Sequence, residues 1–149
     1  MIIGIGTDFV EISRIQKLLD EKGVCFMDRL FTQVERERGI HSAHPASSLA
    51  KRFAAKEALV KAFGLGFSEG ISFQDIEIAN DPKGKPFMTL TGKAEEILHF
   101  LTPSHHVAHI HLSLSDTKTH ALAFVLIEGR CRQGIAYPYN TEGVPSQNV

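Results

Sequence analysis

One predicted helix, in the segment KRFAAKEALVKAFGLG (residues 51–66), most constrains how this chain can fold. Its alanines Ala54, Ala58 and Ala62 recur at every fourth position and so line one side of the helix. Small side chains on one side allow another stretch of backbone to approach the helix closely. We therefore expect another backbone segment close to this stripe, with bulk supplied on the neighbouring arc by Phe53, Val60 and Phe63.

The same segment carries a single carboxylate, Glu57, among the bases Arg52, Lys56 and Lys61. Glu57 and Lys61 are one helical turn apart, the spacing of an ordinary ion pair worth about 0.2–0.5 kcal/mol. A lone carboxylate among bases also suits Mg²⁺ bound together with phosphate, because Mg²⁺ commonly uses one or two carboxylates plus substrate phosphates. Spacing alone favours the ion pair, and the two interpretations remain open at this point.

The composition predicts an ordinary globular protein. The chain has 149 residues, a length that suits one domain. Hydrophobic residues make up 43% and charged residues 22%, which are common values. The net charge of −1 gives no global positive field, so we expect no nucleic-acid partner and place any anion site in a local patch.

The N-terminus and the cysteines indicate the cellular compartment in which we expect the protein. The stretch MIIGIGTDFV is apolar, but it lacks a basic region and a long apolar run, so we interpret it as a buried strand rather than a signal peptide or membrane span. Cys25 and Cys131 are far apart in sequence and form no CxxC motif. Free thiols fit a reducing environment, so we expect a cytoplasmic protein with no membrane association.

Apolar periodicity predicts helices and strands in separate blocks. The first predicted helix starts from a capping box at Asp8 or Ser13 and ends at Gly23, and the second covers residues 26–38. After a loop at 41–48, the third predicted helix is capped at Ser47 or Ser48, and the fourth covers residues 93–101. The predicted strands are residues 2–5, 71–78, 87–91, 107–114 and 121–127. This pattern favours an α+β fold with an antiparallel sheet packed with helices, in one domain at 1–128 that is followed by a flexible tail at 129–149.

Two further positions have a structural and a functional interpretation. Asp8 directly follows the first apolar strand, where it would be an N-cap or turn residue, or a second carboxylate for a metal. The stretch NDPKGKP (residues 80–86) predicts a hairpin turn, or a backbone that must approach a ligand closely.

The remaining polar clusters exclude several classes of site. His109 and His111 would share one face of a strand, but no cysteine joins them and there is no HExxH motif, so a polar strand face is favoured over zinc. Ser113 and Ser115 lack a GxSxG-like elbow or a paired base. The chain also lacks GxxxxGK[ST], which argues against a P-loop nucleotidase.

Four motifs in order resemble the holo-acyl-carrier-protein synthases, a family of 4′-phosphopantetheinyl transferases. They are GIGTDFVEISRI (4–15), AKRFAAKEALVKAFGLG (50–66), SFQDIEIANDPKGKP (72–86) and HLSLSDTKTHALAFVLIE (111–128), and together they cover roughly residues 1–128. The resemblance implies transfer of 4′-phosphopantetheine from coenzyme A to a serine of apo-acyl carrier protein, with release of adenosine 3′,5′-bisphosphate, as part of fatty acid biosynthesis. It also implies Mg²⁺ dependence, the compact phosphopantetheinyl transferase fold, and a homotrimer with active sites between subunits.

The resemblance assigns roles residue by residue. Asp8 and Glu57 become the Mg²⁺ ligands, Lys61 becomes the diphosphate contact, and the three are the expected catalytic residues, with Glu57 as the general base. The residues expected to bind coenzyme A are Arg52, Lys56, Lys61, Gly64, Gly84, Lys85 and Pro86. Because acyl carrier proteins are acidic, a basic docking face is expected on the first helix, at Arg14, Lys17 and Lys22.

One position departs from the family pattern: many members carry a histidine where this chain has Asp116, and the role of Asp116 stays open.

Two other functions remain open, and each requires only some of the residues named above. A small Mg²⁺-dependent nucleotide hydrolase needs only Asp8, Glu57 and the bases, and would release nucleotide without an acceptor. A module that only binds coenzyme A or a protein would give no covalent product.

Overall fold

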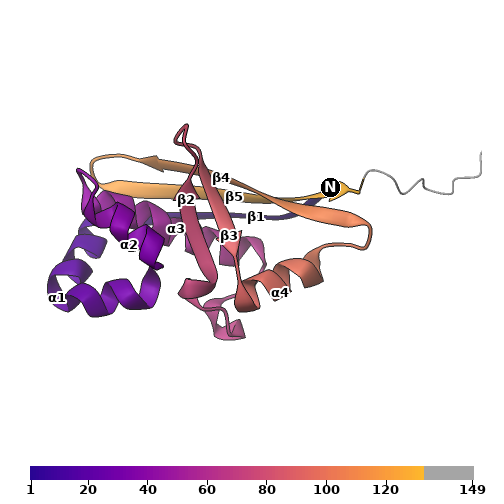
Figure 1. Cartoon of the computed structure of the whole chain (residues 1–149), viewed down its shortest axis with the longest axis horizontal. Helices are drawn as coiled ribbons and strands as arrows, with labels where there is room; N and C mark the ends of the chain where they lie inside the picture. The colour runs from indigo at the N-terminus through magenta and orange to yellow at the C-terminus, as the bar shows by residue number, and fades with distance from the viewer. Residues whose placement is uncertain (133–149) are drawn as a thin grey trace, which may run out of the picture.

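The structure is a computed structural model that describes residues 1–132 (Figure 1). Four α-helices and five β-strands lie in this part of the chain, which confirms the predicted α+β class. In chain order the elements are β1 (Ile2–Glu11), α1 (Ile12–Leu30), α2 (Gln33–Ile40), α3 (Pro45–Ala62), the 3₁₀ turns η1 (Phe67–Glu69) and η2 (Phe73–Asp75), β2 (Ile76–Asn80), β3 (Pro86–Leu90), α4 (Gly92–Leu101), β4 (His106–Asp116) and β5 (His120–Cys131).

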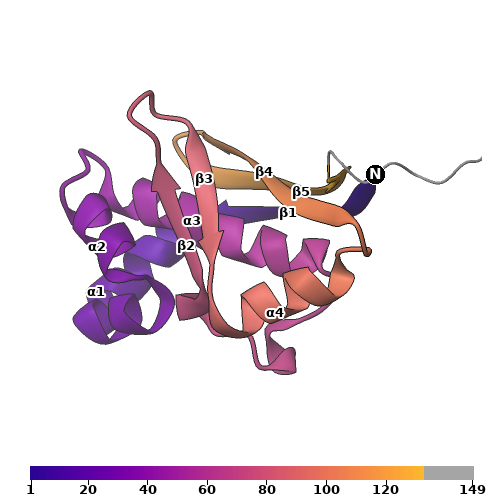
Figure 2. The same ribbon diagram turned by 45° about the vertical axis from the view of Figure 1, so that its right-hand side comes forward.

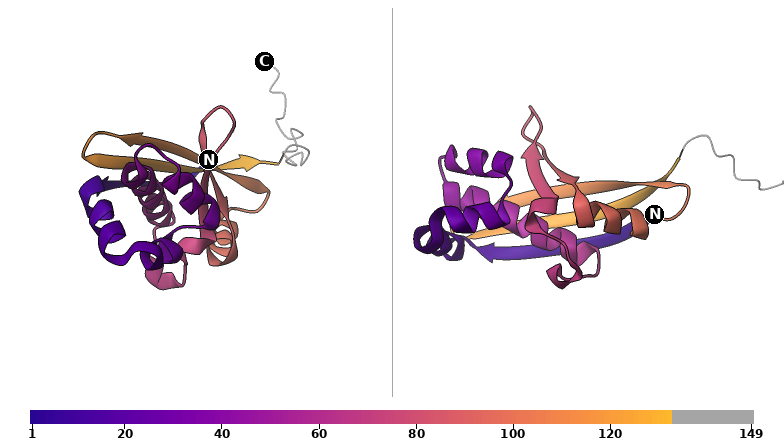
Figure 3. Two further views of the ribbon diagram at one scale, coloured as in Figure 1. Left: turned by 60° about the vertical axis from the view of Figure 1, so that its left-hand side comes forward. Right: turned by 60° about the horizontal axis from the view of Figure 1, so that its bottom comes forward.

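The main sheet has the strand order β1-β5-β4, with each neighbouring pair antiparallel. The helices lie on one side of this sheet, and α3 runs along it against β1 and β5 (Figure 3). A Cβ atom added at Gly4 or Gly6 would lie 2.0 Å from the carbonyl oxygen of Ala62 or Ala58, respectively. The close backbone approach predicted from the alanine stripe is therefore confirmed, and β1 is the strand that makes it.

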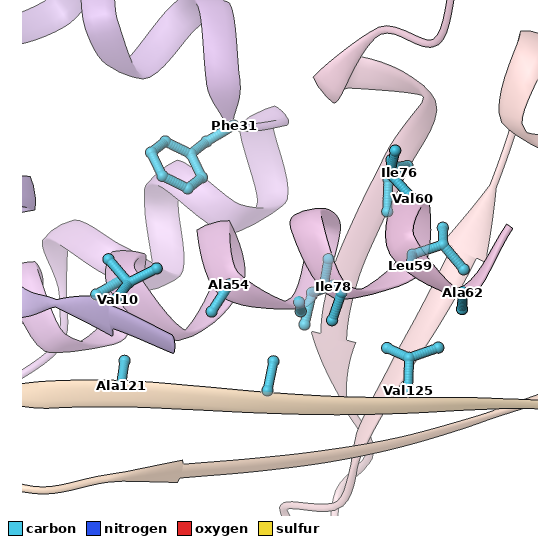
Figure 4. Close-up of a cluster of buried hydrophobic side chains, with 14 of the residues drawn as sticks. Val10, Phe31, Ala54, Leu59, Val60, Ala62, Ile76, Ile78, Ala121 and Val125 are labelled. Atoms are coloured by element: carbon cyan, nitrogen blue, oxygen red, sulfur yellow. The ribbon is translucent and has the colours of Figure 1, made fainter. Parts of the chain in front are cut away.

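The core fills the space between α3, the main sheet and β2 (Figure 4). Val10 and Val125 point from the sheet towards α3, whose Leu59 is fully buried. Ile76 and Ile78 of β2 cover α3 from another direction and are also buried. As a result α3 is enclosed by other elements, and only short arcs of its surface reach solvent.

Strands β2 and β3 form the predicted hairpin, which packs against α3 and β4 (Figure 2). Its turn is organised by Asp81, whose carboxylate accepts the backbone N–H groups of Lys83 and Lys85 at 2.9 Å. Gly84 has a φ of 88°, which a residue with a side chain rarely adopts. The single strand predicted at 71–78 is wrong in its first half, because η2 interrupts it with a capping box at Ser72.

The first helix differs from its prediction at both ends. Strand β1 pairs with β5 as far as Glu11, so neither Asp8 nor Ser13 caps α1, which begins at Ile12. The helix also continues past Gly23, where the backbone kinks, as far as Leu30. Glycine at φ 49° allows the chain to bend there and resume a helix, whereas the sequence pattern shows only a helix breaker.

The next two helices also start at other places than predicted. Thr32 makes a capping box with Glu35, so α2 starts a separate helix within the stretch predicted as 26–38. Helix α3 begins at Pro45, inside the predicted loop, and neither Ser47 nor Ser48 caps it. Proline suits this first position, since its fixed φ is helical and its missing N–H would have no partner there.

Strand β5 continues past Glu128 to Cys131, and the N–H of Gly129 donates to the carbonyl oxygen of Met1 at 2.8 Å. The predicted boundary between domain and tail at residue 128 is therefore too early. Residues 133–149, which hold most of the predicted tail, lie outside the described residues. Within the part of the chain that the structure describes, no helix has the length and apolar character needed to cross a membrane.

Candidate active site

Strand β1 and helix α3 bring three predicted catalytic residues together in what we call the carboxylate site (Asp8, Glu57 and Lys61). Asp8 lies inside β1 with its side chain 14% exposed, and the ammonium of Lys61 donates to its Oδ1 at 2.7 Å. The same ammonium donates to the backbone carbonyl of Thr7 at 3.2 Å. Because Lys61 remains 54% exposed, its charge is accessible to a ligand.

Glu57 is partly buried on the same part of α3. Burial raises the pKa of its carboxyl above the usual value, and the negative charge of Asp8 raises it further. Lys61 and Arg14 act in the opposite direction and offset part of this shift. The two carboxylates are therefore close enough to repel each other, which is the arrangement that a bound cation relieves.

This donor set fits Mg²⁺. Two carboxylates alone leave most of an octahedral coordination sphere for water and phosphate oxygens, as Mg²⁺ prefers. No group of three or more His, Cys, Asp or Glu side chains within residues 1–132 has the geometry of a metal site. The side chain of His111, from the histidine-rich strand, instead lies 2.9 Å from a carboxylate oxygen of Glu128.

A second region, the basic cleft, has a volume of about 620 Å³ and lies between the ends of four elements. Its walls are the C-terminal end of α2, the first turns of α3, the β2–β3 turn and the end of β4. The positively charged or titratable bases in these walls are Arg38, His41, His44, Lys51 and Arg52. The asparagine, glycine and proline of the hairpin turn also line it, at Asn80, Gly84 and Pro86.

Arg52 lies at the bottom of the basic cleft and is only 4% exposed. Its Nη1 donates to the carbonyl and to the hydroxyl oxygen of Ser48, at 2.9 and 2.8 Å, while its buried Nε has no partner within the described residues. Burial lowers the pKa of this guanidinium relative to its usual value. A cleft lined by several bases, this guanidinium among them, is suited to bind an anion.

The wall of the basic cleft carries an ion pair between Lys51 of α3 and Asp116 at the end of β4. The ammonium of Lys51 donates to Oδ1 of Asp116 at 2.8 Å, and the hydroxyl of Ser47 donates to Oδ2 at 2.7 Å. These two hydrogen bonds lower the pKa of Asp116 below its usual value. Asp116 thus joins β4 to two successive turns of α3.

Lys56 was expected to contact coenzyme A, and this prediction is wrong. Its side chain is 0% exposed and forms a 2.7 Å ion pair with Glu35, which is equally buried. Its other hydrogens bond to the carbonyl oxygens of Leu30 and Phe73, both at 2.7 Å. Burial lowers the pKa of Lys56, and the charge of Glu35 offsets part of that shift. With every hydrogen used inside the core, Lys56 has a structural role.

The other residues expected to bind coenzyme A are divided between the two regions. Arg52, Gly84 and Pro86 line the basic cleft, and Lys61 lies in the carboxylate site. Lys85 is exposed and is not a lining residue of the cleft. Gly64 follows α3 with a φ of 73°, where it ends the helix and lies beyond Lys61 rather than at the cleft.

Several cleft residues were missed by sequence reasoning, among them Lys51, Ser47, Arg38 and His44. Lys51 adjoins Arg52, and a basic pair at the start of a helix was the available signal. Arg38 and His44 come from the end of α2 and the residue before α3, whose proximity only the folded chain shows.

The basic cleft does not include the carboxylate site, and the sheet order explains the separation. Asp8 lies on β1 and Asp116 on β4, which are the two opposite edges of the main sheet. Helix α3 connects them, since Glu57 faces the β1 side and Lys51 faces the β4 side. The chain therefore presents the carboxylate site and the basic cleft at different edges of the sheet.

The outward face of the main sheet is apolar along parts of β1 and β5, whereas β4 presents mostly histidine and serine there. Phe9 of β1 lies opposite Leu122 of β5 in the strand register, and Phe124 follows on the same face. These residues and Ile5 are all exposed. An exposed apolar sheet face of this kind is typical of a surface that contacts another protein.

The basic residues of α1 differ in their surroundings. Arg14 is exposed and close enough to the carboxylate site to lower the pKa of Glu57. Lys17 forms a loose, exposed pair with Glu21 at 3.8 Å, and Lys22 is exposed just before the kink at Gly23. The predicted docking face is thus accessible, and Arg14 is the member nearest to the catalytic groups.

The sequence matches known proteins over nearly the whole of the chain that the structure describes. A sequence profile of the 4′-phosphopantetheinyl transferase superfamily matches residues 4–125. A holo-[acyl-carrier-protein] synthase of Bartonella henselae is 48% identical over 128 residues, which are 86% of this chain and 96% of the relative. Another from Phenylobacterium zucineum is 50% identical over 86% of this chain and 93% of its own length.

Solved structures agree with these relatives. The crystal structure of the synthase from Neisseria meningitidis superposes with a TM-score of 0.74 at 38% identity and covers 86% of this chain and 99% of its own. A synthase from Bacillus anthracis in complex with coenzyme A (3′,5′-ADP) gives 0.68 at 37% identity, covering 87% and 99%. These relatives agree with the observed fold and with the meeting of Asp8, Glu57 and Lys61. This chain belongs to the holo-[acyl-carrier-protein] synthases of the 4′-phosphopantetheinyl transferase superfamily.

Proposed function

We propose that this protein transfers the 4′-phosphopantetheine group of coenzyme A to a serine of apo-acyl carrier protein and releases adenosine 3′,5′-bisphosphate, a step that supports fatty acid biosynthesis. The observation that carries the proposal is the meeting of Asp8, Glu57 and Lys61 from two different elements. It is supported by relatives of nearly equal length that are named for this activity.

Asp8 and Glu57 would hold Mg²⁺, which when bound neutralises charge on the diphosphate of coenzyme A. Lys61, freed from part of its contact with Asp8, places a second positive charge on the same phosphates. The serine oxygen forms a bond to the β-phosphorus while the bond from that phosphorus to the bridging oxygen breaks. That oxygen leaves with the adenosine 3′,5′-bisphosphate.

The attacking serine must lose its proton, and Glu57 is the base that we propose. In the metal-free protein the pKa of Glu57 is raised above that of an ordinary glutamate, and a higher pKa favours proton acceptance by a general base. Lys61 and Arg14 lie near enough to offset part of that shift. The proton therefore moves from the serine hydroxyl to the Glu57 carboxylate.

We propose that the nucleotide end of coenzyme A occupies the basic cleft. Arg52 supplies a cation in the wall of this cleft, and Gly84 and Pro86 of the hairpin turn line it as well. Coenzyme A is the bound molecule in solved synthases from Bacillus anthracis and Helicobacter pylori.

The two halves of the site lie at opposite sheet edges, and this supports a homotrimer in which each active site forms between two protomers. The carboxylate site of one protomer would face the basic cleft of the next. Association would bury the exposed apolar residues Ile5, Phe9, Leu122 and Phe124 on the outward face. A heterologous interface of this kind gives a closed ring of identical contacts when its rotation closes.

The acidic carrier protein would dock on α1 beside the carboxylate site, with Arg14 as the nearest contact and Lys17 and Lys22 as further ones. The expected location is the cytoplasm, a proposal supported by the free thiols of Cys25 and Cys131.

The test of the function is the intact mass of apo-acyl carrier protein after incubation with this protein, coenzyme A and Mg²⁺. We expect the mass to increase by one phosphopantetheine group. A chelator added before the reaction should prevent this transfer, and Glu57→Gln should reduce its rate by about 10²–10⁴-fold. Lys93→Met, on α4, is the matched control. Release of nucleotide without the carrier would show a hydrolase, and binding with no mass gain would show a module that only binds.

A further inference from the structure

The C-terminal end of α1 is capped by side chains from distant segments of the chain. A helix leaves its last backbone carbonyl oxygens without an internal partner, so other groups have to satisfy them. The side-chain amide of Gln74, in η2, donates to the carbonyl oxygens of Asp28 and Phe31 at 2.7 and 2.9 Å. The ammonium of Lys56, in α3, donates to the carbonyl oxygen of Leu30 at 2.7 Å. Both η2 and α3 therefore hold the end of α1 in place.

Side-chain packing holds α1 at few points. Only two of its residues are buried, Ile15 before the kink at Gly23 and Phe26 after it. Neighbouring segments do not set the kink itself, because a Cβ atom added at Gly23 would have nothing within 4 Å. A segment held by one buried side chain can turn about that point, so a second fixed point is needed to define its direction. The capping side chains supply this point at the end of α1, as strand β1 does at its start.

The direction of α1 matters because the proposed docking residues for the carrier protein, Arg14, Lys17 and Lys22, lie along it. Arg14 is close enough to Glu57 to act on its pKa, so a carrier bound there would have its serine near the carboxylate site. Lys22 directly precedes the kink, and its position therefore depends on both halves of the helix. The basic face keeps one shape for a carrier only if both halves are held.

We propose that Gln74 is a positioning residue for the docking of acyl carrier protein. Its two hydrogen bonds fix the end of α1 and thereby the direction of the helix face that binds the carrier. Gln74 is not among the residues that line the basic cleft, and it is not part of the carboxylate site. This inference rests on the proposed function and extends it to a residue that acts on the carrier only through α1.

Gln74 tests this role better than Lys56 does. Lys56 also forms the buried ion pair with Glu35, so its loss disturbs the core. Gln74 is exposed, and its replacement removes two hydrogen bonds to the backbone of α1 without opening a cavity in the core. Gln74→Met has a side chain of similar length that cannot donate, whereas the ammonium of Gln74→Lys can donate to the same carbonyl oxygens. Together the two variants separate loss of the donor from a change of shape.

The experiment measures the Kd for apo-acyl carrier protein by calorimetry, without coenzyme A, and the KM of each substrate in the transfer assay. For Gln74→Met we expect the Kd and the KM for the carrier to rise about three- to tenfold, the range for a lost hydrogen bond. The KM for coenzyme A should stay unchanged, and Gln74→Lys should restore most of the carrier affinity. Gln33→Met, which removes an exposed glutamine bond to Glu37 on α2, is the matched control and should change neither value.

Two further measurements test whether Gln74 acts through α1. In the double variant of Gln74→Met with Arg14→Glu, the rise in carrier Kd should be smaller than the product of the two single effects, because both act on one docking face. Hydrogen exchange of the backbone amides of residues 24–30 should be faster in Gln74→Met than in the natural protein, and close to normal in Gln74→Lys.

A carrier Kd in Gln74→Met equal to that of the natural protein would overturn the positioning role. An equal rise in the KM for coenzyme A, or no recovery in Gln74→Lys, would also overturn it, because either result shows a loss that is not specific to docking. The calorimetric measurement involves no chemistry. If the natural protein binds the carrier but transfers no group to it, the proposed function fails, while the carrier affinities still decide the role of Gln74.

Discussion

Gly6 of β1 lies against the carbonyl oxygen of Ala58 in α3, so closely that an added Cβ atom would be 2.0 Å from that oxygen. Gly4 has the same relationship with Ala62 one turn further on. This contact sets the distance between strand and helix, and the carboxylate site depends on that distance. Asp8 comes from the strand, whereas Glu57 and Lys61 come from the helix.

Gly6→Ala should therefore reduce both stability and activity. The helix backbone has to move away from β1, which costs roughly 1–3 kcal/mol of unfolding free energy, as overpacking does. Activity should fall further, by about 10²-fold, if Asp8 is displaced by 1 Å from Glu57. Urea unfolding and single-turnover transfer measure the two effects. Gly129→Ala is the control, because the atoms nearest to its added Cβ belong to side chains that can move.

Mixed trimers should recover activity from two inactive variants. Glu57→Gln removes the carboxylate half of the site and Arg52→Met removes the cleft half. We assume that each active site uses one half from each of two neighbouring protomers. In an equal mixture each half is then intact at about half of the interfaces, so both halves are intact at about a quarter of them, and about a quarter of the natural activity should return.

Refolding the two variants together and assaying transfer to the carrier protein makes this measurement. Refolding each variant alone gives the baseline, and circular dichroism shows that Arg52→Met is folded. Activity of the mixture at the baseline would place both halves of the site in one protomer.

Loss of the buried pair between Lys56 and Glu35 should destabilise the protein strongly. Lys56→Met leaves the Glu35 carboxylate without its counter-charge at a position with 0% exposure, and this should cost about 3–5 kcal/mol. Lys93→Met breaks an exposed pair and should cost less than about 1 kcal/mol. Urea unfolding compares them. Similar losses for both variants would show that Lys56 is no more important to the core than a surface lysine.

The carboxyl group of Glu57 should titrate above its usual pKa of 4.5 in the metal-free protein. Burial is the main cause and Asp8 the second, so Asp8→Asn should lower this pKa without restoring it fully. Carbon NMR of the glutamate carboxyl groups measures both values.

The same shift affects stability with a definite sign. Because folding raises the pKa of an acid here, the folded state holds the proton more tightly than the unfolded state, and stability falls as pH rises from about 4.5 through the raised pKa. Glu57→Gln should remove that fall. A pH profile of unfolding free energy identical in the natural protein and Glu57→Gln would contradict the shift.

Charge reversal at Arg14 should slow association with the acidic carrier protein. We expect a decrease of about three- to tenfold at low ionic strength that becomes small at high salt, because screening removes the long-range part of the attraction. Stopped-flow association at two salt concentrations measures it. Lys93→Glu changes charge equally on α4 and is the control; an equal effect there would mean that α1 is not the docking face.

Much of the fold was predictable, because it depends on local patterns. The alanine stripe, the hairpin at NDPKGKP, helix 93–101 and the last two strands all have strong periodicity or turn residues, and all appear in the structure close to the predicted positions. The errors lie at element ends. Gly23 and Pro45 are ambiguous in sequence, since glycine can kink a helix or end it, and proline can start a helix or precede one.

Local sequence patterns were enough to predict the helix with Glu57 and Lys61, and the resemblance to a family predicted that both meet Asp8. Which of the bases are accessible became clear only from the folded chain. Lys56 and Lys61 look alike in the sequence, yet Lys56 is enclosed by α1, α2 and η2 while Lys61 faces Asp8 at the surface. The physical reason is that burial and counter-charge come from segments far away along the chain, so no local pattern contains them.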